Sequence, residues 1–212
     1  HGDYFPIVFY PNSVSELYQY TVAAFNAAEE SMSPVILLSD GYISHLYETI
    51  IPHRDFTIKT RSRLPLGTGN RHFTGLSHDD SVPQTSDVDN YRRLITHFRE
   101  KQQLTAQRYN SYEYLECSKE TDTLLISYGA LSRIAYYFKN DFALYRPIRM
   151  FPIVEEIKII ASRYKRILIV EMNMGQYARE IERILHREVE FIPILGGRID
   201  LKEIKQKIYG QK

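Results

Sequence analysis

Short hydrophobic runs alternate with amphipathic stretches along most of the chain. The runs are largely uninterrupted by polar residues, which is typical of strands buried on both faces of a parallel sheet. The amphipathic stretches repeat apolar residues every three or four positions and predict helices. This order predicts an α/β fold in which helices cover both faces of a parallel sheet. The strand-like runs are 7–10, 35–40, 123–127, 142–145, 167–170 and 189–194, and later helices are expected at 87–114, 132–140, 154–164, 175–187 and from Asp200 onward.

A first helix is predicted to begin at Ser13, directly after the first run. Ser13 and Glu16 have the spacing of a capping box, in which each side chain bonds the backbone N–H of the other residue. One face of this helix should be buried and its end exposed. The expected buried set is Val14, Leu17, Phe25 and Ala28, and the expected exposed pair is Glu29 and Glu30.

The pattern divides the chain into three parts. Residues 1–55 read as strand, helix and strand. Residues 56–114 are predicted to be a long loop rich in Pro, Gly and Ser, followed by a linker helix. Residues 115–212 alternate regularly between strand and helix, which indicates a small, complete parallel-sheet domain. The apolar face of the linker helix is expected to hold Tyr91, Leu94, Ile95 and Phe98.

Composition narrows the class of protein. The chain has 212 residues, of which 43% are hydrophobic and 25% charged, and its formal net charge is +1. It can bury a core, and it lacks the roughly 20 consecutive apolar residues that a membrane-spanning helix requires. The balanced charge, without a basic stripe, argues against nucleic acid or a membrane as a partner.

Cys117 is the single cysteine of the sequence. It cannot form a disulfide within the chain, so the composition fits a reducing compartment and a cytoplasmic location. It also cannot hold an iron–sulfur cluster alone, because such clusters take several cysteine thiolates. Any cluster in the biology of this protein is therefore expected on another chain.

The loop between the predicted domains offers two candidate sites. The glycines and Arg71 of 67–72 could approach a phosphate, but no strand precedes them as a dinucleotide fingerprint requires. His72, His78, Asp79 and Asp80 could hold a divalent metal, but their spacing matches no helical ligand pattern. A structured polar loop without a metal is the preferred interpretation of both.

Two polar segments follow predicted strands, where ligands bind in open α/β sheets. Ser127 lacks the glycine two residues earlier that a nucleophile elbow needs, and Gly129 is explained by a tight turn. The second segment contains Glu171, Asn173 and Gly175. It could bind a ligand or a partner, or Asn173 could cap the next helix. Periodicity leaves these alternatives open.

Eight motifs follow one another in a characteristic order. They are His1-Gly2-Asp3-Tyr4, Pro11-Asn12-Ser13-Val14, Pro34-Val35-Ile36-Leu37-Leu38-Ser39-Asp40, Arg71-His72-Phe73-Thr74-Gly75-Leu76, Ile126-Ser127-Tyr128-Gly129, Arg146-Pro147, Val170-Glu171-Met172-Asn173 and Gly196-Gly197. In this order the sequence resembles the alpha subunit of the 2-oxoacid:ferredoxin oxidoreductases, most closely the 2-oxoglutarate type. The resemblance covers nearly the whole chain.

The resemblance implies a fold and a reaction. It implies part of a pyrimidine-type thiamine-diphosphate-binding domain, followed by a domain like the C-terminal domain of transketolase. Such enzymes convert a 2-oxoacid and coenzyme A to acyl-CoA and carbon dioxide and pass electrons to ferredoxin. Thiamine diphosphate with Mg is shared with a beta subunit, iron–sulfur clusters lie on partner subunits, and gamma and delta subunits are further partners.

The resemblance also assigns candidate residues. The substrate loop of the family precedes His-Gly-Asp, so catalytic residues are expected upstream of His1 and the isolated chain is expected to be inactive. His1, Asp3 and Asp40 are the candidates for cofactor binding. An interface or structural role is assigned to Glu171, Asn173, Gly175 and Gln176. A pyruvate or branched-chain enzyme of this family and a non-catalytic interaction module remain as alternatives.

Overall fold

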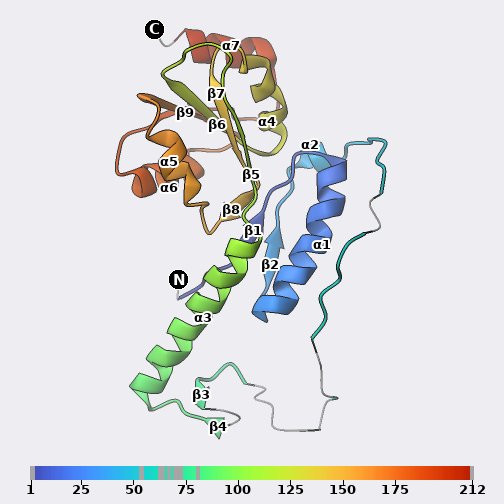
Figure 1. Ribbon diagram of the computed structural model, residues 1–212, viewed down its shortest axis with the longest axis vertical. Helices are drawn as coiled ribbons and strands as arrows, with labels where there is room; N and C mark the ends of the chain where they lie inside the picture. The colour runs from blue at the N-terminus through green and yellow to red at the C-terminus, as the bar shows by residue number, and fades with distance from the viewer. Residues whose placement is uncertain are drawn as a thin grey trace.

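The computed structural model describes residues 3–52, 55–61, 65, 68, 74–79 and 82–210. Within them, strands form a three-stranded sheet of order β2-β1-β8, a five-stranded sheet of order β10-β9-β6-β7-β5, and the hairpin β3–β4. Figure 1 shows the five-stranded sheet and its helices as one lobe, and the long helix α3 extending away from it beside α1. None of the described helices is long and apolar enough to cross a membrane.

The first sheet confirms the predicted strand–helix–strand unit. Strand β1 (Ile7–Phe9) pairs in parallel with β2 (Val35–Leu37), and α1 (Val14–Ser31) connects them. Ile7 and Phe9 form a small core with Ala27 of α1 and with Ala106 of α3 (Val88–Arg108). Strand β2 is only half-buried, contrary to expectation, because it lies at an edge of its sheet.

The buried face of α1 differs from the prediction. Phe25 is 71% exposed, and the buried residues include Asn26 and Ala27. The extended segment 55–61 runs along this helix, where Asn26 donates to the Thr57 carbonyl at 2.8 Å and accepts from the Lys59 N–H at 2.8 Å. Asn26 is therefore buried, because its side chain satisfies backbone groups of this segment, whereas Phe25 is left exposed.

The end of α1 is also less exposed than predicted. Glu30 contacts Lys59 and Arg108, and Glu29 pairs with Arg61 at 3.2 Å. The prediction of an exposed carboxylate pair was wrong, because segment 55–61 brings basic side chains to both glutamates.

The start of α1 forms half of the predicted capping box. Ser13 Oγ accepts a hydrogen bond from the Glu16 N–H at 3.2 Å. Glu16 does not bond the Ser13 N–H; it accepts from the Asn12 N–H at 2.9 Å and from Arg146. The reciprocal bond was wrongly predicted because the Glu16 carboxylate accepts from the N–H one residue earlier and from Arg146, a cation distant in sequence.

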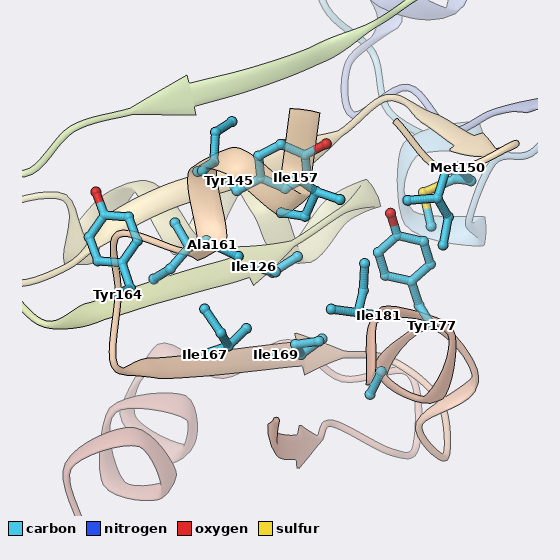
Figure 2. Packing of buried hydrophobic residues seen from close by; sticks show 14 of the residues in the cluster. Ile126, Tyr145, Met150, Ile157, Ala161, Tyr164, Ile167, Ile169, Tyr177 and Ile181 are labelled. Atoms are coloured by element: carbon cyan, nitrogen blue, oxygen red, sulfur yellow. The ribbon is translucent and has the colours of Figure 1, made fainter. Parts of the chain in front are cut away.

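The five-stranded sheet has helices on both faces, as predicted. Its parallel strands are β6 (Thr123–Ser127), β7 (Ala143–Pro147), β9 (Arg166–Glu171) and β10 (Glu190–Pro193). One core joins the sheet to α5 (Glu156–Ala161) and α6 (Gln176–Leu185), and Figure 2 shows Ile157 and Ile181 packed there near Ile126 and Ile169. The other core joins it to α4 (Gly129–Ala135) and α7 (Leu201–Tyr209).

Two antiparallel strands were not predicted. Helix α3 ends at Arg108 rather than continuing to 114, and β5 (Tyr112–Leu115) pairs with β7 at the sheet edge. After β7 the chain leaves the five-stranded sheet, and strand β8 (Arg149–Phe151) pairs with β1 of the three-stranded sheet. Both strands are short, and their pairing partners are distant in sequence, so local periodicity does not reveal them. The sheets are therefore mixed rather than wholly parallel.

The predicted apolar face of α3 is only partly covered. Leu94, Ile95 and Phe98 are half-buried, whereas Tyr91 is exposed. The fully buried positions of this helix are mostly polar, because its packed side lies against α1 and the hairpin of β3 (His78–Asp79) and β4 (Val82–Pro83). They are Asn90, Gln102, Thr105 and Ala106.

Candidate functional site

A cleft lies where the carboxyl ends of parallel strands from both sheets converge. Tyr10 follows β1, Asp40 lies between β2 and the short helix α2 (Gly41–Ser44), and Tyr128 follows β6. The cleft has a volume of about 380 Å³. Its described lining residues are Tyr10, Leu38, Asp40, Tyr128, Met150, Phe151, Ile153, Met172, Asn173, Gln176, Tyr177 and Glu180. This position agrees with the rule that ligands bind at the carboxyl edge of open α/β sheets.

Asp40 joins the two sheets at the floor of the cleft. One carboxylate oxygen accepts from the Ile43 N–H at 2.8 Å and caps α2. The other accepts from the Ala130 N–H at 2.8 Å, at the start of α4, and from the Tyr10 hydroxyl at 3.4 Å. Burial and the neighbouring Asp40 carboxylate raise the pKa of Tyr10 well above its usual range.

Gly129 permits this close approach. Its φ of +56° lies in the left-handed region, and a Cβ there would stand 2.8 Å from the Tyr10 ring and 2.9 Å from Asp40 Oδ2. From the sequence, a tight strand-to-helix turn is sufficient to account for Gly129. The structure adds that the space beside it is filled by residues of the other sheet.

Glu171 lies behind the lining residue Tyr128 and is 1% exposed. Its carboxylate accepts from the Tyr128 hydroxyl at 2.5 Å and from the N–H groups of Tyr177 at 3.2 Å and Ala178 at 3.1 Å. Burial, together with the bond to Glu171, raises the pKa of Tyr128 above its usual range. The negative charge of Glu171 therefore lies at the amino end of α6, where the helix dipole favours it.

Asn173 forms the turn that leads into α6, beside Glu171, and Gly175 is the N-cap residue of this helix. The side-chain oxygen of Asn173 accepts from the N–H groups of Gly175 at 2.9 Å and Gln176 at 3.1 Å, and its amide donates to the Tyr128 hydroxyl at 2.8 Å. Gly175 has a φ of +87° and faces the Phe191 ring. The capping alternative for this segment therefore has direct geometric support, whereas contact with another subunit stays a prediction.

The structure brings only some of the predicted site residues together. Asp40, Asn173 and Gln176 line the cleft. Asp3 is exposed and precedes β1, at the end of the first sheet opposite to Asp40. His1 lies outside the described residues, so the predicted cofactor-binding roles of His1, Asp3 and Asp40 stay predictions.

The aromatic residues of the cleft are not among the site residues that the sequence predicts. Tyr10, Tyr128, Phe151 and Tyr177 all line it. The first two could have been found, because Tyr10 ends the predicted strand 7–10 and Tyr128 directly follows the predicted strand 123–127. Phe151 could not, because its strand is recognised only through its pairing with β1.

The other sequence candidates have ordinary structural surroundings or were not described. Ser127 is buried, and its hydroxyl donates to the Val170 carbonyl at 3.1 Å, so it is not placed as a nucleophile. Most of the 67–72 loop and Asp80 lie outside the described residues. Within the described part of the chain, no three His, Cys, Asp or Glu residues form a group that could hold a metal.

Comparison with known proteins reveals a family and a fold. Residues 3–116 match the family model "Pyruvate flavodoxin/ferredoxin oxidoreductase, thiamine diP-bdg". The 2-oxoglutarate synthase subunit KorA of Methanothermobacter marburgensis is 33% identical over 100% of this chain and 65% of its own length. The ketoisovalerate oxidoreductase subunit VorB of the same organism is 30% identical over 98% of this chain and 61% of its own length. The chain thus spans less than two thirds of these relatives.

A solved structure has the same fold over the whole chain. It is described as 2-oxoglutarate:ferredoxin oxidoreductase from Magnetococcus marinus with 2-oxoglutarate, coenzyme A and succinyl-CoA bound. The TM-score is 0.84 at 21% identity, covering 100% of this chain and 43% of that one. At this identity the match supports the α/β architecture.

The cleft does not fit a complete thiamine diphosphate. A diphosphate needs cations or a metal, and the described lining contains no Lys, Arg or His. The oxygens of Asp40 and Glu171 already accept from backbone N–H and tyrosine groups. The described residues therefore supply no diphosphate or metal site at this cleft.

Proposed function

Because the chain belongs to the pyruvate flavodoxin/ferredoxin oxidoreductase family, we propose that it is a subunit of a 2-oxoacid:ferredoxin oxidoreductase acting on 2-oxoglutarate. The observation that carries the substrate assignment is the match of the entire chain to a 2-oxoglutarate synthase subunit at 33% identity. The same fold over the full length of the chain supports the assignment to this class of enzyme.

The reaction converts 2-oxoglutarate and coenzyme A to succinyl-CoA, carbon dioxide and a proton. Two electrons leave the substrate and reduce two molecules of oxidised ferredoxin. Losing carbon dioxide from a 2-oxoacid leaves a carbanion that a cofactor must stabilise. Iron–sulfur clusters on partner subunits would carry the electrons, because the single Cys117 cannot ligate one alone.

Thiamine diphosphate, with Mg, is proposed to be shared with a beta subunit. The absence of cationic residues from the described cleft lining supports this division, because the diphosphate then has to be held elsewhere. Gamma and delta subunits complete the proposed assembly, and ferredoxin is the proposed acceptor. A cytoplasmic location fits the single cysteine.

Within this assembly the chain would act as a framework. Asp40, which follows β2 of the three-stranded sheet, accepts from the Ala130 N–H of α4. Arg146, on β7 of the five-stranded sheet, donates to Glu16 of α1. Such bonds hold the carboxyl edges of both sheets in one arrangement. The isolated chain is proposed to be inactive, and activity to belong to the assembled enzyme.

An anaerobic assay of the purified assembly tests this function. Coenzyme A and 2-oxoglutarate together should reduce a viologen dye and form succinyl-CoA, and omission of either should abolish reduction. A preference for 2-oxoisovalerate would instead favour the branched-chain function that the VorB match supports. Pyruvate is the third substrate tested, because a pyruvate enzyme of this family is the other alternative. An assembly inactive on all three would contradict the proposal and favour a non-catalytic interaction module.

A further inference from the structure

The cleft combines aromatic walls with negative charge. Four rings line it, from Tyr10, Tyr128, Phe151 and Tyr177. Asp40 and Glu180 add two carboxylates, and none of the described lining residues is Lys, Arg or His. An anionic ligand is therefore disfavoured, because it would meet two carboxylates and no cationic side chain among the described lining residues.

Three of the rings form a continuous chain of contacts. The ring centroids of Tyr10 and Tyr128 are 5.4 Å apart at 56°, and those of Tyr128 and Tyr177 are 5.3 Å apart at 69°. The hydroxyls of Tyr10 and Tyr128 donate to Asp40 and Glu171. A hydroxyl that donates to a carboxylate leaves its ring richer in electrons, and the face of an aromatic ring is already its negative region.

Met150 and Met172 also contribute to the walls. Thioether groups are polarisable and adapt their shape to a bound group. The volume of about 380 Å³ lies within the range of small-molecule sites, which starts near 300 Å³. A bare metal ion is disfavoured, because Asp40 already accepts three hydrogen bonds and the described residues contain no three-ligand cluster.

We propose that this cleft binds an organic cation, an ammonium or guanidinium group held over the tyrosine rings. Cations placed over aromatic faces are attracted by cation–π interaction, and cages of aromatic residues recognise quaternary ammonium groups in this way. The carboxylate of Glu180 adds a counter-charge; it also pairs with Arg183 at 2.9 Å, outside the described lining. The proposal does not depend on activity toward 2-oxoacids.

The cation has two possible sources that share this chemistry. It is either a free organic cation or a lysine or arginine side chain of another subunit. The full-length gene product, purified together with any chains that accompany it, is the material for the test. Choline and its uncharged isostere 3,3-dimethyl-1-butanol are the matched probes, and saturation-transfer NMR or tyrosine fluorescence measures binding.

Two pairs of variants separate the cleft from the rest of the surface. Leu38→Lys adds a cation to the cleft wall, and Leu195→Lys is its control; these leucines are 42% and 55% exposed. Glu180→Gln removes a lining carboxylate, and Glu188→Gln is its control at an exposed position outside the described lining. All four changes are at exposed or half-buried positions, and circular dichroism verifies folding.

If the natural ligand is a free cation, choline should bind at least tenfold more tightly than 3,3-dimethyl-1-butanol. Leu38→Lys should then abolish binding and Glu180→Gln weaken it severalfold, while both controls bind as the unmodified protein does. If the cation is a side chain of another subunit, neither probe should bind. Leu38→Lys, unlike Leu195→Lys, should then release an accompanying chain. Equal binding of both probes would overturn the proposal. So would failure of both probes with an intact Leu38→Lys assembly.

Discussion

Arg146 of β7 forms a bidentate ion pair with Glu16 at the start of α1, with N–O distances of 2.9 and 2.5 Å. Arg146 is 4% exposed, and its Nε also donates to Glu113 of β5 at 2.9 Å. Burial opposes the charge of Arg146, but the bonds to Glu16 and Glu113 outweigh it and raise its pKa above the usual value. A single buried cation thus joins α1 to the edge of the five-stranded sheet.

Removing this cation should be strongly destabilising. Arg146→Met leaves Glu16 and Glu113 without their main donor, and breaking a buried pair costs about 3 kcal/mol in the free energy of unfolding. Urea unfolding of the purified protein measures the loss. Arg163→Met is the control: Arg163 pairs with Glu116 at 3.1 Å between largely exposed side chains. Its cost should stay within about 0.5 kcal/mol, and an equal cost for both variants would contradict the assignment.

Replacing Arg149 by Met should not lower the free energy of unfolding, unlike the same replacement of Arg146. Arg149 is also 4% exposed, but no carboxylate pairs with it among the described residues, and its buried Nε has no hydrogen-bond partner there. Burial lowers its pKa. Its guanidinium donates to the Ala106 carbonyl, which also accepts from the Tyr109 N–H. Arg149→Met should therefore leave stability unchanged or raise it by about 1 kcal/mol. A loss matching that of Arg146→Met would refute this account.

A methyl group at Gly129 should separate the two sheets at the cleft. Gly129→Ala combines a positive φ with contacts of 2.8 Å to Tyr10 and 2.9 Å to Asp40, so the unfolding free energy should fall by about 1–3 kcal/mol. Gly41→Ala is the matched control, because nothing lies within 4 Å of a Cβ there. Thermal unfolding of both variants tests the comparison, and a control that loses as much would contradict it.

Glu48, which connects α1 to α4, should make the stability of the fold decrease in acid. Its carboxylate bonds Arg133 of α4 at 2.7 Å and the Val14 N–H of α1 at 2.9 Å, and the bond to Arg133, followed by that to Val14, lowers its pKa. The unfolded chain has the ordinary value, which is higher. The stabilisation is therefore complete above about pH 4.5 and disappears as the pH falls through the lowered value.

Glu48→Gln measures this contribution. The variant should melt at a lower temperature than the unmodified protein at pH 6, and the difference should vanish toward pH 3. A difference that is constant across this range would show that the charge of Glu48 is not responsible.

Glu171 should behave as a structural residue. Glu171→Gln replaces one acceptor oxygen by an amide donor among Tyr128, Tyr177 and Ala178, so the variant should lose about 2 kcal/mol of stability even without partner chains. Arg179→Gln, at an exposed position of the same helix, is the control. Unchanged stability of Glu171→Gln with weakened subunit assembly would favour an interface role instead.

Local patterns predicted much of the framework for a physical reason. The continuous apolar runs at 123–127 and 167–170 form neighbouring parallel strands, because only burial on both faces suits such runs. Asp200 caps α7 by accepting from the N–H groups of Lys202 and Glu203, as a short acceptor side chain before an amphipathic stretch predicts. Motif order also carried the family assignment, which the match over residues 3–116 confirms.

The sequence by itself therefore determined the α/β class, the main parallel strands and the family, because these depend on neighbouring residues or on motif order. Only the tertiary structure decided the pairing of β8 with β1 and the convergence of Tyr10 with Tyr128. It also decided that Glu16 binds Arg146 instead of completing its own capping box. Such contacts join residues far apart in sequence, and burial of the charges and rings, rather than local preference, selects them.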